Sequence, residues 1–149
     1  MSATLVENKK VRLRFSILET FSAGLELAGG EVKSLRAKLG SLEGARIIVR
    51  GGEAFLVGAT IPPYQVANTP KGYDPEKPRK LLLQKKEIGL LADAESKKGL
   101  TTVPLEVYNA GRYVKLRLAI VKGKGKADKR EDLKKSDAMR EAERAVHSK

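Results

Sequence analysis

Cysteine and tryptophan are absent from this sequence, and histidine occurs once, at His147. Without cysteine the chain can form no disulfide, no thiolate zinc site and no cysteine nucleophile. A histidine so close to the end of the sequence is expected to be too mobile to act as a general base. These absences exclude catalytic triads based on cysteine or histidine, and metal sites built on thiolate or histidine ligands. We therefore expect a binding protein without a cofactor, not an enzyme.

Long apolar runs are also missing. No stretch approaches the roughly 20 apolar residues that span a bilayer. Residues 1–11 contain no apolar segment of the kind that forms a secretory signal. We therefore expect a cytoplasmic protein that does not enter a membrane.

Positive charge is what the sequence has in excess. Lysine and arginine number 30 against 18 acidic residues, which gives a net charge of +12. Such a surplus attracts polyanions, and with membranes set aside the expected partner is nucleic acid. Because aromatic residues make up only 5% of the chain, we expect recognition through phosphates and shape more than through base stacking.

The last part of the chain differs from the rest in apolar content. Residues 122–149 hold ten basic and six acidic side chains but few apolar ones. That is too little to offset the entropy of ordering the segment. We therefore expect a folded, nucleic-acid-binding body at residues 1–121 and a basic tail at residues 122–149. Asp128 and Glu131 resemble a helix capping pair, so the tail is expected to be disordered alone and helical when bound.

Strand patterns dominate the body. Apolar and polar residues alternate most clearly between Val114 and Ile120. The Gly51-Gly52 pair suits a two-residue hairpin turn because glycine adopts positive φ without strain. The leucine run at residues 81–83 predicts a further, buried strand. The other predicted strands occupy residues 14–27, 45–50, 53–59, 101–108 and 113–121.

Two helices interrupt the strands. Residues 30–39 place Leu35 and Leu39 on one apolar stripe, and residues 84–98 carry a second helical pattern that ends at a glycine. A proline-rich loop is expected at residues 61–78. Short antiparallel strands with these helices predict a mainly β fold, an OB-type closed antiparallel β-barrel with two to three associated α-helices.

Charged residues supply the candidate sites. Glu19, Glu26 and Glu31 are expected at the surface, with Glu31 complementing a helix dipole. The Gly-Lys-Gly-Lys run that starts at Gly123 lacks the spacing of a Walker loop and is expected to be a flexible basic linker. The candidate phosphate contacts of the body are Lys33, Arg36, Arg79, Lys80, Lys85, Lys86, Lys115 and Arg117.

Six short strings, in their order and spacing, resemble one family. They are Ala23-Gly24-Leu25-Glu26-Leu27, Gly30-Glu31-Val32-Lys33-Ser34-Leu35-Arg36, Arg79-Lys80-Leu81-Leu82-Leu83, Val103-Pro104-Leu105, Lys122-Gly123-Lys124 and Asp128-Lys129-Arg130. Each string alone says little, but the ordered set covers nearly the whole chain and is specific. The sequence is similar to the small protein B family, the SsrA-binding proteins of bacterial ribosome rescue.

This resemblance implies an OB-type barrel that binds the tRNA-like domain of transfer-messenger RNA (SsrA RNA) and delivers it to stalled ribosomes for trans-translation. The implied partners are that RNA and the ribosome, including small-subunit ribosomal RNA. The protein would be monomeric on the RNA, with its tail in the empty mRNA channel near the decoding centre. The implied RNA-binding residues are Asn8, Phe15, Ser22, Gly24, Lys33, Ser34, Arg36, Leu82 and Lys115. The implied ribosome-binding tail residues are Lys122, Lys124, Lys126, Asp128, Lys129, Arg130, Lys134 and Lys135.

Some positions depart from the family pattern. Ser22 stands where the family usually has glutamate, and Phe15 where a tyrosine or another aromatic is common. Gly125 replaces a lysine, and Ala127 stands where an aromatic residue or histidine is often found. Two other functions stay open: a general OB-fold RNA chaperone or structural ribosome-associated protein, and an RNA-processing enzyme, for which the sequence offers no cysteine, internal histidine or clear metal cluster.

Overall fold

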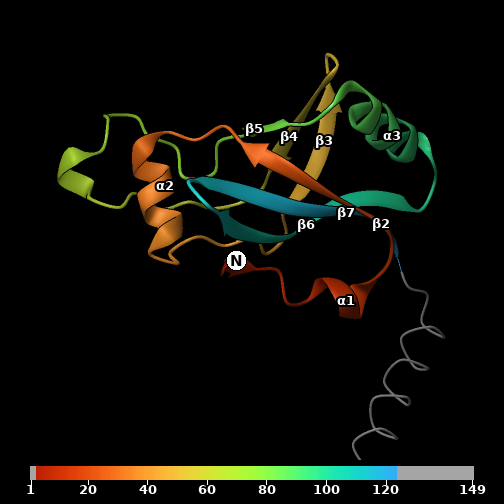
Figure 1. Cartoon of the computed structure of the whole chain (residues 1–149), viewed down its shortest axis with the longest axis horizontal. Coiled ribbons are helices and arrows are strands. Elements are labelled where there is room, and N and C mark those ends of the chain that lie inside the picture. Colours follow the sequence, from red (N-terminus) through yellow and green to blue (C-terminus); the bar gives the residue numbers. More distant parts are fainter. Residues whose placement is uncertain (1–2, 124–149) are drawn as a thin grey trace, which may run out of the picture.

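A computed structural model of the chain describes residues 3–123 (Figure 1). All seven strands of this part join one antiparallel sheet in the order β1-β6-β7-β2-β5-β4-β3. The fold is therefore mainly β with three α-helices, as the sequence predicts. The elements are β1 (Ala3–Glu7), α1 (Val11–Arg14), β2 (Phe15–Leu25), α2 (Gly29–Arg36), β3 (Arg46–Arg50), β4 (Glu53–Val57), the 3-10 helix η1 (Val66–Asn68), β5 (Arg79–Leu82), α3 (Lys85–Ser96), β6 (Leu100–Ala110) and β7 (Tyr113–Gly123).

The long strands β2, β6 and β7 form the body of the sheet, and α2 and α3 lie at its opposite ends (Figure 1). The alternation predicted for β7 is confirmed, because Val114, Leu116, Leu118 and Ile120 are all buried in the main core. The Gly51-Gly52 turn between β3 and β4 is confirmed as well, since both glycines have positive φ.

The sheet rolls on itself, but within residues 3–123 no hydrogen-bonded ladder joins its two edge strands, β1 and β3. Instead β3 lies against β6, and α3 contacts both. The Val49 N–H of β3 donates to the Glu95 carboxylate of α3 at 3.0 Å, and Arg50 Nη1 lies 2.6 Å from the other carboxylate oxygen. A side chain therefore occupies the edge where a closed barrel would continue its ladder. The predicted closure is not confirmed by hydrogen bonding.

The helix predicted at residues 30–39 ends at Arg36, earlier than expected. Lys38 has a φ of 62°, in the left-handed region, and this stops the helix. Leu35 is buried as predicted, but Leu39 lies beyond the helix end and is 48% exposed. The prediction that Leu39 shares the apolar stripe is wrong.

The leucine run at residues 81–83 is only partly buried. Leu81 points into the core, whereas Leu82 is 55% exposed because successive strand residues face opposite sides of the sheet. The prediction of a buried Leu82 is therefore wrong. Arg79 shares the inward face with Leu81 and is itself only 2% exposed.

One strand and one α-helix were not predicted from the sequence, nor was the short 3-10 helix η1 within the predicted loop. The edge strand β1 is short, and its pairing with β6 shifts register between Thr4 and Val6. The helix α1 is a single turn without a side-chain cap. Neither has enough residues to show a periodicity of its own.

The strand β7 continues to Gly123, so Lys122 belongs to the sheet, where it pairs with Ser16 and Leu100. The remaining predicted tail residues lie outside the described part of the chain, as does His147. They are Lys124, Lys126, Asp128, Lys129, Arg130, Lys134 and Lys135.

Among residues 3–123, no helix is long and apolar enough to cross a membrane.

Candidate nucleic-acid interface

Four of the residues implied in RNA binding meet in one open depression on the outer face of the sheet. We call it the sheet hollow; its volume is about 600 Å³. Gly24 of β2 pairs with Lys115 of β7 on one side and with Leu82 of β5 on the other. Strand register therefore places these three residues in a single row. The hollow is lined by Ser22, Gly24, Glu53, Lys80, Leu81, Leu82, Leu83, Gln84, Glu87, Ile88 and Lys115.

The glycine in this row has a structural reason. A Cβ at Gly24 would lie 3.3 Å from both Cβ and Cδ1 of Leu82. The Leu82 side chain thus lies across the glycine, and a larger residue would push it away. Because Leu82 is also more than half exposed, it offers an apolar surface beside open backbone.

The cations near the hollow differ in how they are paired. Arg117 Nη1 contacts Glu106 Oε1 at 2.5 Å, and its guanidinium lies 5.0 Å from the centre of the Tyr108 ring. Lys80 Nζ lies 3.0 Å from Glu53 Oε1, and this hydrogen bond and charge raise the pKa of Lys80. Lys115 has no ion pair within the described residues. It is therefore the lysine of this row that can take a phosphate without giving up a partner.

Ser22 lines the sheet hollow with a neutral hydroxyl group. Its hydroxyl is hydrogen-bonded to the Tyr108 hydroxyl. The position where the family usually carries a carboxylate therefore holds a neutral group with an internal partner. The nearby Arg117 is neutralised by Glu106 instead.

Asn8 and Phe15 do not join the sheet hollow. Phe15 pairs with Gly123 and lies nine residues before Gly24 on β2, which at about 3.3 Å per residue places it about 30 Å away. Its ring packs on the small cluster around Val11. The Asn8 side-chain amide donates to the Pro104 carbonyl at 2.9 Å and so holds the chain before α1 against β6.

The three implied residues of α2 have separate surroundings. Lys33 is exposed and has no ion pair within the described residues. Arg36 donates to the Arg112 carbonyl at 2.9 Å and so ties α2 to the turn between β6 and β7. Ser34 is fully buried, and its hydroxyl donates to the Pro62 carbonyl at 2.6 Å. Its side chain holds the helix in place and does not reach the surface.

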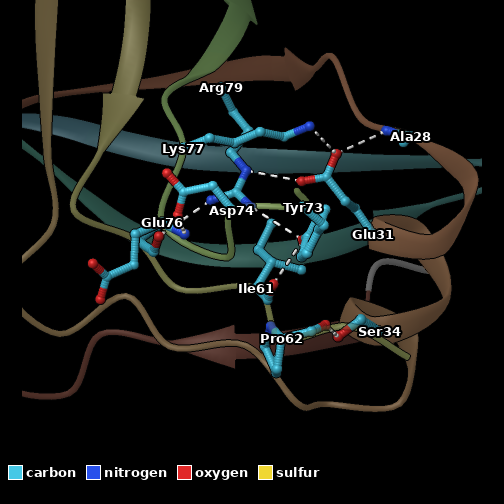
Figure 2. A network of polar contacts seen from close by, with 11 residues as sticks. Ala28, Glu31, Ser34, Ile61, Pro62, Tyr73, Asp74, Glu76, Lys77 and Arg79 are labelled. Atoms are coloured by element: carbon cyan, nitrogen blue, oxygen red, sulfur yellow. Dashed lines mark hydrogen bonds and ion pairs between the residues drawn. The ribbon is translucent and has the colours of Figure 1, made fainter. Parts of the chain in front are cut away.

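A buried ion pair that sequence reasoning missed lies behind α2 (Figure 2). Arg79 Nε contacts Glu31 Oε2 at 2.9 Å, and both side chains are nearly inaccessible. Arg79 also donates to the Ala59 carbonyl and to the Tyr73 hydroxyl. The predictions of a surface Glu31 and a phosphate-binding Arg79 are therefore wrong, because each satisfies the other in the interior. Alternation with the buried Leu81 was the signal that could have placed Arg79 inside.

The same network fixes the long loop at residues 61–78. The Tyr73 hydroxyl donates to the Ile61 carbonyl at 2.7 Å, and Ile61 N–H donates to the Pro75 carbonyl. Burial, followed by the charge of Glu31, raises the pKa of Tyr73. Lys77 Nζ lies 3.6 Å from the Glu31 carboxylate. The loop is thus held to α2 by buried polar contacts, which Figure 2 shows together.

Residues 3–123 contain no group of three or more histidine, cysteine, aspartate or glutamate side chains that could hold a metal ion.

Comparison with known proteins matches the sequence of this chain to one family. The family model of the SmpB protein matches residues 5–148. The SsrA-binding protein of Gloeobacter violaceus is 45% identical over 142 residues, which are 95% of this chain and 93% of that protein. The SsrA-binding protein of Chromohalobacter salexigens is 44% identical over 147 residues, which are 99% of this chain and 94% of that protein.

A solved structure agrees in three dimensions. A chain in the structure described as "tmRNA-SmpB: a journey to the center of the bacterial ribosome" is similar to this one with a TM-score of 0.69 and 39% identity. The similarity covers 88% of this chain and 95% of that chain. The family resemblance inferred from the six strings is confirmed, and the chain belongs to the SmpB protein family.

Proposed function

We propose that this protein binds the tRNA-like domain of transfer-messenger RNA, the SsrA RNA, and delivers it to stalled ribosomes for trans-translation. One observation carries the proposal. Ser22, Gly24, Leu82 and Lys115, which come from three different strands, meet in one open hollow. Relatives that share almost the whole length of this chain are SsrA-binding proteins, so a shared RNA-binding face is the simplest use of that hollow.

The chemistry of the hollow suits a folded RNA. Lys115 supplies a positive charge without an internal partner, and a phosphate is its natural counter-ion. Gly24 lets an RNA backbone approach the strand closely because it has no side chain. The exposed Leu82 can pack against a ribose or an unstacked base. Contacts of this kind read shape and backbone more than sequence.

The fold that carries the hollow is proposed to act as an OB-type barrel. The rolled sheet would be completed by side-chain packing where β3 lies against β6 and α3 contacts both. Binding without catalysis, a cytoplasmic location and a monomer on the RNA belong to the same proposal. The residues that contact RNA are proposed to be those of the sheet hollow together with Lys33.

A charge-removal experiment tests the RNA-binding proposal. Lys115→Ala should weaken binding to the tRNA-like RNA and lower the slope of log affinity against log salt by about 0.7 to 0.9. Lys98→Ala, which removes the same charge beyond the far end of α3, is the control and should leave the slope unchanged. Equal slopes in both variants would mean that the hollow does not bind phosphate. Equal affinity of the wild type for unstructured RNA would favour a general RNA chaperone.

The tail is proposed to contact the ribosome and not the tRNA-like domain of transfer-messenger RNA. Truncation should follow Gly123, because Lys122 and Gly123 complete β7. The truncated protein should keep most of its affinity for the tRNA-like RNA but lose peptide tagging on stalled ribosomes. Tagging at the full rate would show that Lys124, Lys129, Arg130 and the other tail residues are dispensable.

A further inference from the structure

A second hollow lies between α2 and the loop at residues 61–78, and we call it the α2 hollow. It has a volume of about 610 Å³, within the range of about 300 to 1,000 Å³ typical of small-ligand sites. No residue lines both this hollow and the sheet hollow. The residues that line it include Ala28, Gly30, Glu31, Lys33, Tyr64, Pro70, Lys71, Tyr73, Asp74 and Lys77.

The walls combine an aromatic ring with positive charge. Tyr64 is 46% exposed, and Lys33 and Lys71 have no ion pair within the part of the chain that the structure describes. Sequence composition predicts little aromatic stacking for this protein. The structure nevertheless brings two of the four tyrosines, Tyr64 and Tyr73, into one cavity.

Two carboxylates, those of Glu31 and Asp74, are among the residues that line this hollow. Glu31 is buried, and its oxygens contact Arg79 Nε at 2.9 Å, the Ala28 N–H at 3.0 Å and Lys77 Nζ at 3.6 Å. The Asp74 carboxylate accepts the Glu76 N–H at 2.9 Å. Asp74 is in no ion pair among the described residues, but Lys33 and Lys71 outnumber it, so the unpaired charge at the walls is positive on balance and favours a ligand with negative charge.

The α2 hollow is also preformed. Tyr73 lines it, and Figure 2 shows that the Tyr73 hydroxyl is linked to Arg79 and to Ile61, so this wall is fixed by hydrogen bonds. Ser34 fixes the start of the loop by its bond to Pro62. A ligand would meet an ordered wall and would not have to order the loop itself, which favours binding.

The two hollows are close along the backbone. The strand β2 leads from Gly24 to the start of α2 at Gly29, a separation of five residues or at most about 17 Å. On the other side, β5 leads from Leu82 back toward Lys77 at the wall of the α2 hollow. A single folded RNA on the sheet hollow can therefore also reach the α2 hollow.

We propose that the α2 hollow receives one unpaired nucleotide of the RNA that lies on the sheet hollow. The base stacks on Tyr64, and Lys33 and Lys71 contact the flanking phosphates. The nucleotide must be unpaired, since a base inside a helix does not expose its face to a side chain. This inference rests on the proposed RNA-binding function and adds to it a specific place for a loop or bulge nucleotide.

Ring substitutions in the full-length protein test this assignment. Tyr64→Ala should weaken binding to the tRNA-like RNA by roughly 5- to 100-fold, the loss expected for one stacked base. Tyr64→Phe keeps the ring and should retain nearly all the affinity. Val66→Ala is the matched control, because Val66 is 81% exposed on the same loop but does not line the hollow. Because the Tyr64 side chain is half exposed, its removal should leave the fold intact, which a thermal melt checks.

Crosslinking gives an independent readout. With 4-thiouridine placed in turn at each unpaired position and at several paired positions of the RNA, one unpaired position should crosslink to the peptide that contains Tyr64. The proposal would be overturned if Tyr64→Ala bound the RNA as tightly as Val66→Ala does. Crosslinks from paired positions alone would overturn it as well. Should Tyr64→Ala fail to fold, Lys33→Ala with Lys71→Ala replaces it, and unchanged affinity and salt slope would overturn the proposal equally.

The outcomes separate this inference from the function on which it rests. If Lys115→Ala weakens RNA binding and Tyr64→Ala does not, the RNA-binding proposal stands and the nucleotide site is wrong. If the wild type does not prefer the tRNA-like RNA, both are wrong. The second probe is uridine monophosphate. If this nucleotide binds saturably while Tyr64→Ala leaves the RNA affinity unchanged, the α2 hollow is a site for free nucleotides. That result would also overturn the proposal.

Discussion

The sheet hollow and the α2 hollow have nearly the same volume but are built in different ways. Backbone pairing puts Gly24, Leu82 and Lys115 in one row, whichever side chains they carry. Side chains build the α2 hollow, because Glu31 and Arg79 hold the helix to a long loop. A site built on strand register should survive the loss of one side chain. A site built on a buried ion pair should be lost when either partner of the pair is removed.

The largest predicted effect comes from breaking that ion pair. Arg79→Leu leaves the buried Glu31 carboxylate with only the partly exposed Lys77 at 3.6 Å and the Ala28 N–H. We expect a loss of about 3 kcal/mol in the free energy of unfolding. Lys80→Leu, at the next residue of β5, removes an exposed cation paired with Glu53 and should cost far less stability than Arg79→Leu, because exposed ion pairs are screened by solvent. Urea denaturation measures both. A loss below about 1 kcal/mol for Arg79→Leu would show that the loop does not depend on the pair.

A smaller loss of stability is expected from a substitution in the sheet hollow. Gly24→Ala places a Cβ 3.3 Å from Leu82, and the exposed leucine should move outward at a cost of about 1 kcal/mol. RNA affinity should fall more clearly than stability, because the added methyl group and the displaced leucine narrow the hollow. Gly89→Ala in α3, where a Cβ meets no atom within 4 Å, should instead stabilise the helix slightly. Normal RNA affinity in Gly24→Ala would mean that the row is not a contact surface.

The smallest effect depends on pH and belongs to the α2 hollow. Because the folded protein raises the pKa of Tyr73, this tyrosine stabilises the fold fully below its unfolded pKa, near 10. That contribution is lost as the pH rises through the higher folded value. The stability difference between the wild type and Tyr73→Phe should therefore shrink above about pH 10. Urea denaturation from pH 8 to pH 11 checks this, and a constant difference would contradict it.

The same contrast explains what could be predicted from the sequence. The alternation from Val114 to Ile120 and the Gly51-Gly52 turn follow local rules, and both are confirmed. The meeting of Gly24, Leu82 and Lys115 depends on which strands pair, and periodicity does not determine strand pairing. Only the family resemblance grouped these three residues before the structure was known.

The contacts of the α2 hollow were beyond prediction for a different reason. Glu31 and Arg79 are 48 positions apart, and charged residues are rarely buried unless they pair with each other. Composition alone therefore favours placing each of them at the surface. Only the tertiary structure shows that each has its partner inside.

The contact between Glu95 and Val49 has a consequence for how the molecule behaves at high concentration. An edge strand with open N–H groups can pair with a second chain and start intermolecular sheet growth. On β3 the Val49 N–H already donates to the Glu95 carboxylate of α3, and Arg50 pairs with the same carboxylate, so two charged side chains lie along this edge. On the opposite edge, the register shift in β1 interrupts the regular spacing that a foreign strand would need. Both exposed borders of the sheet are thus poor templates for aggregation, although the sheet is not closed by hydrogen bonds.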